Sequence, residues 1–199
     1  MIKRQTFFNQ VAESWDKEYD NSKLHAFLEQ FVPSFGLSAG QHILDVGTGT
    51  GILIPFLHRV VGSEGHITAI DYAQKMVDIC KIKYSNLPNV SIMVSNAEHL
   101  QFPNNSFDAV ICFGVFPHLD NKKIALNQFY RVLKSKGKLI IAHALSRAEV
   151  RHHHQNTPAV AKDVLPNEKI IQKMLAKAGF TGIQIVDKQG SYLCTSTKS

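Results

Sequence analysis

Cysteine is scarce in this sequence, and no apolar stretch is long. Cys80, Cys112 and Cys194 are far apart and odd in number, so neither a disulfide framework nor a C-x-x-C metal or redox motif is indicated. The longest apolar stretch, about ten residues from Phe107 to Phe116, is too short to span a membrane. The opening residues MIKRQTFFNQVAESW are interrupted by polar side chains where a signal peptide needs an apolar block. We therefore expect a reduced, cytoplasmic protein without a membrane span.

The composition fits one globular domain. With 199 residues, 44% of them hydrophobic and 19% charged, the chain can form one full core and is too short for two ordinary domains. It contains no internal repeat and no low-complexity linker. Residues 1–199 are therefore predicted to form a single domain.

The net charge of +6 is unevenly distributed along the chain. Residues 1–100 carry 8 Lys and Arg against 10 Asp and Glu, whereas residues 101–199 carry 14 against 6. A basic second half would suit an anionic substrate or a nucleic acid. No lysine cluster is interleaved with aromatic residues, however, so a solvated lysine-rich surface is the preferred interpretation and a nucleic-acid partner is not expected.

Apolar runs alternate with helical patterns from Gln41 onward. The alternation is typical of βαβ units and predicts an α/β fold, a parallel sheet covered by helices on both faces. The predicted strands are Ile43–Val46, Ile67–Ile70, Val90–Val94, Phe107–Phe113 and Lys138–Ala142. The helices predicted between them lie near Ile52–Val61, Ala73–Tyr84 and Lys122–Leu133.

The two ends of the chain have patterns of their own. Two amphipathic segments, Lys3–Trp15 and Ser22–Phe31, come first, and the proline and glycine of VPSFG end the second. Near the other end, a polar, histidine-rich connection precedes a helix over Asn167–Ala178. Strands over Ile183–Asp187 and Ser191–Thr195 then meet at KQG, which predicts an antiparallel C-terminal hairpin.

The stretch HILDVGTGTG joins a buried strand to glycines at alternate positions and then to a helical pattern. Such a turn presents backbone N–H groups, backed by a helix dipole, to a bound ligand. Dinucleotide sites place a third glycine at the position that Ile52 occupies here. Asp71 closes the second strand, twenty residues past Gly51, where a carboxylate can accept both hydroxyls of a ribose. A nucleoside-like ligand is therefore indicated more strongly than a pyrophosphate, and the alternative is a structural turn without a ligand.

Four stretches together resemble the successive motifs of class I S-adenosylmethionine-dependent methyltransferases: ILDVGTGTG, ITAIDYAQKMV, SNAEHLQFPNNSFDAVICFGVFPHLDN and RVLKSKGKLIIAH. The chain is most similar to the small-molecule, type 11 branch, which includes the methyltransferases of ubiquinone and menaquinone biosynthesis. This resemblance implies a Rossmann-like, doubly wound sheet that binds S-adenosylmethionine and releases S-adenosylhomocysteine. It also implies a helical lid over residues 1–40, a cofactor-binding core over 41–144 and an acceptor-pocket insertion over 145–166.

The resemblance assigns cofactor contacts residue by residue. The loop under the methionine part and ribose would be formed by Gly47, Thr48, Gly49 and Gly51, with Asp45 orienting the amino group. Asp71 matches the ribose ligand, and Tyr72 and Met76 match positions that pack on the adenine. The adenine edge would be read by Asn96, Ala97 and Glu98; the family often has aspartate where Asn96 stands. Phe113 and Gly114 match the end of the fourth strand, close to the transferred methyl group. The lid would place Trp15 or Tyr19 over the site, although Trp15 could equally be an ordinary core aromatic.

Methyl transfer from a sulfonium needs chiefly exclusion of water and alignment of the nucleophile. A general base is required only when the acceptor carries a proton, as a phenol, amine or acidic carbon does. His118 and His143 follow the fourth and fifth predicted strands and are the candidate bases, against the alternative that they are structural. The run His152–His154 could ligate a metal, but its spacing matches no established pattern, so no metal is predicted.

The acceptor is expected to be a small molecule held by residues after the fifth strand. Candidates there are Arg147, His153, His154 and Asp163, which could instead be ordinary surface residues. Alternative functions are an RNA methyltransferase of the same fold, a nucleotide-binding reductase and a non-catalytic cofactor-binding protein. The reductase is disfavoured by the missing third glycine and by the absence of a catalytic Tyr-Lys pair. A monomer or a homodimer is expected.

Overall fold

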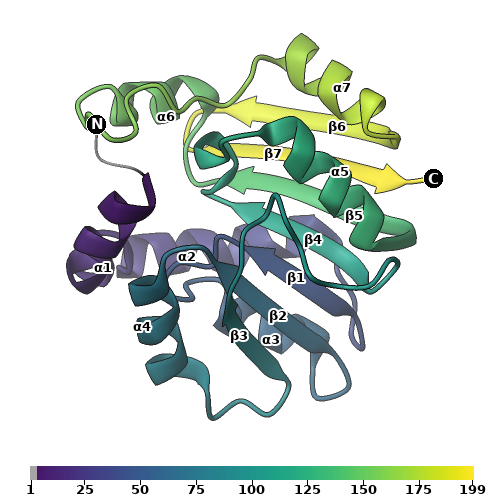
Figure 1. Ribbon diagram of the computed structural model, residues 1–199, viewed down its shortest axis with the longest axis horizontal. Coiled ribbons are helices and arrows are strands. Elements are labelled where there is room, and N and C mark those ends of the chain that lie inside the picture. Colours follow the sequence, from purple (N-terminus) through teal and green to yellow (C-terminus); the bar gives the residue numbers. More distant parts are fainter. Residues whose placement is uncertain (1–3) are drawn as a thin grey trace.

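The computed structural model describes residues 4–199, which fold around one seven-stranded sheet (Figure 1). The strand order is β3-β2-β1-β4-β5-β7-β6. The first five strands in this order, β3 to β5, are parallel to one another. Strand β7 runs antiparallel to both of its neighbours, β5 and β6. The strands are β1 (His42–Val46), β2 (His66–Asp71), β3 (Val90–Val94), β4 (Phe107–Phe113), β5 (Leu133–His143), β6 (Phe180–Lys188) and β7 (Ser191–Lys198).

Side chains alternate along each strand and build a core on each face of the sheet. In β1, Leu44 and Val46 join one core cluster, while Ile43 joins the other. Nearly every residue of the central strands is buried, as expected for strands covered on both sides. The prediction of a mostly parallel sheet with an antiparallel C-terminal hairpin is therefore confirmed.

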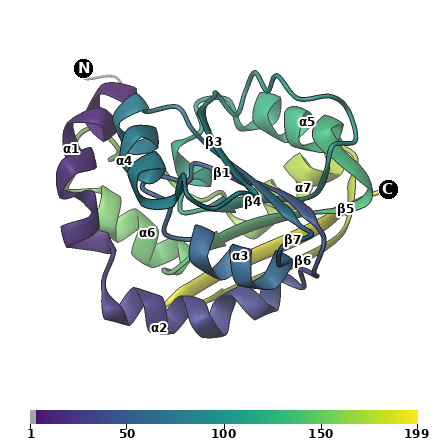
Figure 2. The ribbon, with the colours of Figure 1, turned by 90° about the horizontal axis from the view of Figure 1, so that it is seen from below.

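Two groups of helices cover the faces (Figure 2). Helices α2 (Ser22–Phe31) and α3 (Ile54–Val61), with the short 3-10 helix η1 (Val32–Phe35), pack on one core, as does Cys80 of α4 (Gln74–Tyr84). Helices α5 (Lys122–Val132), α6 (Arg147–His154) and α7 (Glu168–Lys177) pack on the other. Helix α1 (Arg4–Tyr19) contributes only Ala12 to the buried residues and packs chiefly against α4. No helix among residues 4–199 is long and apolar enough to cross a membrane.

The strand order reverses at β1, which pairs with β2 on one side and with β4 on the other. A crevice outside the carboxyl ends of the strands opens at such a switch point. The chain places Asp45, Asp71 and Phe113 at or near these ends, and both ribbon views place α1 and α6 beside them. The sheet topology therefore brings the predicted cofactor residues to one edge.

Several element boundaries differ from the predictions: α1 continues to Tyr19, β6 spans Phe180–Lys188 and β7 extends to Lys198. Helix α3 begins at Ile54 rather than Ile52, because the chain first makes a turn in which the Ile54 N–H donates to Gly51. Strand β5 begins at Leu133 and continues through Lys136, whose φ of 63° lies in the left-handed region. Lys3, the predicted start of the first helix, lies outside the described residues.

Helix α6 was not predicted, because RAEVRHHH is too polar to show an apolar period. Its first turn is fixed by a capping box between Ser146 and Glu149, in which each side chain accepts a backbone N–H of the other residue. The S-x-x-E spacing is a helix-start signal that could have identified this helix.

Candidate active site

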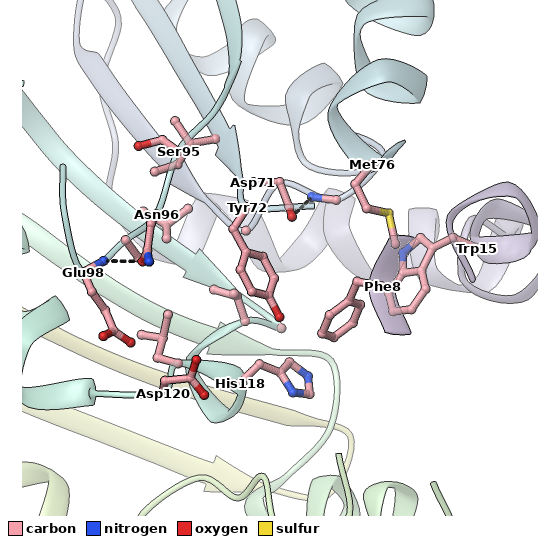
Figure 3. Close-up of a pocket in the computed structure, with 18 residues that line it drawn as sticks. Phe8, Trp15, Asp71, Tyr72, Met76, Ser95, Asn96, Glu98, His118 and Asp120 are labelled. Atoms are coloured by element: carbon pink, nitrogen blue, oxygen red, sulfur yellow. Dashed lines mark hydrogen bonds between the residues drawn. The ribbon is translucent and has the colours of Figure 1, made fainter. Parts of the chain in front are cut away.

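A cavity lies at the switch point, bounded by the carboxyl ends of β1, β2 and β4 and by α1 (Figure 3). Apolar and polar side chains both contribute to its wall, as in small-molecule sites generally. Predicted residues that line it are Trp15, Gly47, Gly49, Asp71, Tyr72, Met76, Asn96, Ala97, Glu98, Gly114 and His118.

The glycine turn allows the chain to pass close to its neighbours. Gly47 has a φ of 69°, and a Cβ added there would lie 2.3 Å from Cγ2 of Val115. Gly51 has a φ of 94°, and its Cβ would lie 2.6 Å from Cε2 of Tyr84. A side chain at either position would therefore be strained and would displace a neighbour.

The N–H groups of this turn are used within the protein, which corrects the expectation that they face a ligand. Gly47 and Thr48 both donate to the carbonyl of Ile70, at 2.8 and 2.9 Å, and Gly49 donates to Oδ2 of Asp71 at 3.0 Å. A phosphate would need such donors to be available. The turn is thus poorly suited to a pyrophosphate, in agreement with the missing third glycine.

Two buried carboxylates give the site its charge. Asp71 also accepts the Ala73 N–H at 2.9 Å, and burial raises its pKa although these backbone donors oppose the shift. Asp45 lies deeper, 1% exposed, and its Oδ2 has no hydrogen-bond partner among residues 4–199. Burial, together with the nearby charge of Asp71, raises the pKa of Asp45 to about 7. A positively charged ligand would relieve the cost of burying both groups.

The far wall of the cavity comes from β2, α4 and the segment after β3. Tyr72 and Met76 present apolar surface, while the segment Ser95–Glu98 is held by its own hydrogen bonds. Oδ1 of Asn96 accepts the Glu98 N–H at 2.8 Å, and Oε1 of Glu98 accepts the Asn121 N–H at 2.6 Å. These contacts fix the positions of Asn96 and Glu98 relative to each other and to Asn121.

Helix α1 closes the remaining side with Phe8 and Trp15. The two rings meet edge to face, 5.9 Å between centroids, and pack on a small cluster formed by Ala12, Ala73 and Met76. Both interpretations of Trp15 hold, because it lines the cavity and belongs to this cluster. Tyr19 lies against Trp15 at 4.3 Å but does not line the cavity.

Polar contacts hold α1 in place at both ends. Near its C-terminal end, Oδ1 of Asp16 accepts the Thr50 hydroxyl at 2.5 Å, and Oδ2 pairs with Lys83 at 3.1 Å. At its N-terminal end, Arg4 donates to both oxygens of Asp163 and also pairs with Asp120. The helix thus connects the glycine turn with the segment that follows α6.

The predicted histidines form a cluster rather than separate sites. Nδ1 of His118 lies 2.8 Å from Oδ2 of Asp163, and Nδ1 of His154 donates to the carbonyl of Asp163 at 2.6 Å. The rings of His118 and His154 are 4.8 Å apart. His143 lies beneath, where burial and then the charges of the other histidines lower its pKa to about 3. His143 is therefore neutral at physiological pH.

Other predicted residues do not line the cavity. Arg147 pairs with Asp187 of β6 at 3.4 Å, and His153 is exposed with Nε2 3.3 Å from the Tyr19 hydroxyl. The other predicted residues outside the lining are the half-buried Phe113 and His143 and the buried Asp45, Thr48, Gly51, His154 and Asp163. No group of three His, Cys, Asp or Glu within residues 4–199 is arranged to hold a metal ion.

Several residues of the site were not predicted from the sequence. Arg4 and Phe8 lie on α1, and Val115, Leu119 and Asp120 follow β4. The last three stand within VFPHLD, beside the predicted His118, so their proximity was a usable signal. No sequence pattern indicated that Arg4 belongs to the site, since its partner Asp163 is 159 positions away.

Fold and cavity together define a class I, Rossmann-like site for a nucleoside-type ligand, and comparisons with known proteins agree. The sequence profile of a methyltransferase domain matches residues 44–141. The ubiquinone/menaquinone biosynthesis C-methyltransferase UbiE of Psychromonas ingrahamii is 37% identical over 141 residues, which cover 67% of this chain and 56% of that protein. UbiE of Marinomonas sp. is 31% identical over 185 residues, covering 86% and 73%. A SAM-dependent methyltransferase of Aquifex aeolicus superposes with a TM-score of 0.76 at 25% identity, covering 94% and 98%.

The chain therefore belongs to the class I S-adenosylmethionine-dependent methyltransferases, in the type 11 branch. It spans only about half the length of several curated relatives that it matches, 56% and 54% in two cases. The predicted family, fold and cofactor are confirmed.

The residues of the cavity fit the family's cofactor. S-adenosylmethionine carries a sulfonium and an ammonium group, and the site offers the buried carboxylates of Asp45 and Asp71, one with an oxygen lacking a partner within residues 4–199. Tyr72 and Met76 provide apolar surface for an adenine. Unlike a dinucleotide, this cofactor needs no phosphate cradle.

Proposed function

We propose that the protein transfers the methyl group of S-adenosylmethionine to a small-molecule acceptor. The observation that carries the proposal is the cavity itself, in which Phe8 and Trp15 of α1 face the predicted cofactor residues and His118 contributes to the lining. When bound, the cofactor supplies an activated methyl group on sulfur. The protein then has to hold the acceptor in line with that group and exclude water.

We infer roles for the chain's own residues from their positions. Asp71 accepts the ribose hydroxyls, Asp45 supplies negative charge beneath the cofactor, and Asn96 and Glu98 border the adenine. Helix α1 acts as a lid, with Phe8 and Trp15 keeping water from the reacting atoms. The segment 145–166 supports the lining residue His118 through Asp163 and His154.

The lining of the cavity favours a small acceptor over RNA. A polynucleotide would need an open, basic groove leading to the methyl group, whereas the side that α1 contributes to this cavity is aromatic, with Phe8 and Trp15. The relatives are named as C-methyltransferases of ubiquinone and menaquinone biosynthesis, and we accordingly propose an aromatic acceptor. We also propose that the protein acts in the cytoplasm, as its three free cysteines suit a reducing compartment. One chain supplies every lining residue, so a monomer or a homodimer could act.

Binding of the cofactor is the first test. We expect S-adenosylmethionine and S-adenosylhomocysteine to raise the melting temperature, since a ligand at 100 times its Kd stabilises the native state by about 2.7 kcal/mol. NAD(P) should leave the melting temperature unchanged, because the N–H groups of Gly47, Thr48 and Gly49 already donate within the protein. Thermal-shift assays measure this directly.

Asp71→Asn should weaken binding of S-adenosylhomocysteine at least about tenfold, the loss of one charge-assisted hydrogen bond. Asp78→Asn, on the exposed side of α4, is the matched control. Transfer of labelled methyl to catechol, and not to tRNA, would support the acceptor class. Tight binding of NAD(P), or labelling of tRNA alone, would contradict the proposal.

A further inference from the structure

His118 has a defined tautomer because of its partner. Asp163 is 2% exposed, and although burial opposes ionisation, hydrogen bonds from His118 and Arg4 lower its pKa to about 2. A carboxylate can only accept a hydrogen bond, so the proton between the two groups stays on Nδ1 of His118. The neutral ring therefore carries its lone pair on Nε2.

The other side of the His118 ring belongs to the cavity. His118 is among the residues that line it, and its Nε2 makes no hydrogen bond with any residue in the described part of the chain. The Phe8 ring packs edge to face on the His118 ring, with 5.2 Å between centroids. The His154 ring is tilted against it, with 4.8 Å between centroids. The imidazole is thus fixed in orientation while its unprotonated nitrogen remains available to a ligand.

The orientation depends on the lid. Nε and Nη2 of Arg4 donate to the two oxygens of Asp163 at 2.7 and 2.6 Å, a bidentate arrangement that fixes the plane of the carboxylate. The guanidinium also shares the negative charge of Asp163, which would otherwise act on His118 alone. Since Arg4 lies in the first turn of α1, the arrangement is complete only when this helix covers the cavity.

We propose that His118 is the general base of the reaction, that Asp163 and the lid residue Arg4 position it, and that the acceptor is a weak acid such as a phenolic O–H or an activated C–H. The proposal rests on the proposed function. In the step, the acceptor's bond to hydrogen breaks and the proton moves to Nε2 of His118. The electron pair stays on the acceptor atom, which bonds to the methyl group as the carbon–sulfur bond gives its electrons to sulfur. The imidazolium later releases the proton to water.

The tautomer can be measured on the free protein without any turnover. Nitrogen-15 spectra of the histidine rings, with His118 assigned through His118→Gln, should show a neutral His118 ring with hydrogen on Nδ1 and none on Nε2. Asp163→Asn should shift the population toward hydrogen on Nε2, because the amide can donate to Nδ1. A wild-type ring with hydrogen on Nε2 would overturn the proposal even if the Asp163 variant failed to fold.

Matched acceptors test the chemical role. His118→Gln should lower methylation of catechol about 100-fold or more, the usual contribution of a positioned base. Methylation of thiophenol, already ionised as a thiolate at pH 8, should change less than about threefold. Arg4→Gln should reduce kcat on catechol about tenfold and leave the rate of thiophenol methylation within about threefold of the wild type. Arg59→Ala, which replaces an exposed arginine on α3, is the control.

Two failures can be told apart. Equal losses on catechol and thiophenol, or an unchanged rate on catechol, would overturn the role of His118 as a base. Absence of transfer to every acceptor, despite cofactor binding and hydrogen on Nδ1, would instead contradict the proposed function and with it the base.

Discussion

At the residue scale, Asp45 is the most unusual group in the site. It combines full burial with an oxygen that has no partner within residues 4–199, and its pKa lies near 7. A protein that acted only as a scaffold would gain stability from an amide or an apolar side chain there. The carboxylate is understandable if a cationic ligand is present during function.

Replacing Asp45 with asparagine should change how stability depends on pH. The native protein keeps the Asp45 proton to a higher pH than the unfolded chain does. The contribution of protonated Asp45 to the free energy of unfolding is therefore present in full below pH 3.8 and is lost as pH rises through about 7. The rise from 3.8 to about 7 corresponds to about 4 kcal/mol. Asp45→Asn should therefore gain stability relative to the wild type between pH 5 and pH 8, as urea unfolding at both pH values would measure.

Comparison with the wild type at each pH cancels the titration of groups that do not interact with Asp45. Glu64→Gln, at an exposed position, controls for the loss of one surface carboxylate. The same stability difference between Asp45→Asn and wild type at pH 5 and pH 8 would contradict the raised pKa.

At the element scale, α1 forms one side of the cavity. Only Ala12 of its sixteen residues is fully buried, so its attachment combines the partly buried rings of Phe8 and Trp15 with polar contacts at both ends. The Asp16–Thr50 contact is the most direct, because it joins the helix to the glycine turn.

Asp16→Ala should remove this contact and speed dissociation of S-adenosylhomocysteine. The hydrogen bond to a charged group is worth about 1.5–3 kcal/mol, while the half-exposed pair with Lys83 adds less than about 1 kcal/mol. We expect dissociation to become about tenfold faster or more. Trp15, the single tryptophan of the chain, lines the cavity and provides a fluorescence signal for stopped-flow measurements.

Glu18→Ala is the matched variant for this experiment, because Glu18 lies on the same helix and is exposed. Its dissociation rate should equal that of the wild type. If S-adenosylhomocysteine also dissociated from Asp16→Ala at the wild-type rate, α1 would not control access to the cavity.

At the scale of the whole molecule, local rules predicted the parts of the site that are close in sequence. The glycine spacing after β1 and the carboxylate at the end of β2 follow from strand–turn–helix geometry, and the structure brings Gly47, Gly49 and Asp71 together. The internal use of the turn's N–H groups could not be predicted, since it depends on how closely β2 approaches it.

Polar contacts between residues far apart in the chain could likewise not be predicted from the sequence. Arg4 and Asp163 carry no motif, and only the docking of α1 across the switch point brings them together. Asp163 was predicted to bind the acceptor, whereas both its oxygens are used by Arg4 and His118. Charged residues far apart in the chain have many possible partners, and packing selects among them.

This distribution of contacts predicts that the molecule opens in parts. Helix α1 buries little apolar surface, whereas α7 buries Ile171 and Leu175 in the core that it shares with α5 and α6. Regions with few buried apolar contacts exchange their amide hydrogens through local opening, below the free energy of global unfolding. We expect S-adenosylhomocysteine at 100 times its Kd to slow exchange in α1 about 100-fold, because opening the helix must release the ligand. Exchange in α7 serves as the internal reference and should change less than about threefold. Mass spectrometry of deuterated peptides would resolve both helices, and equal protection of α1 and α7 by the ligand would mean that the lid does not open independently of the sheet.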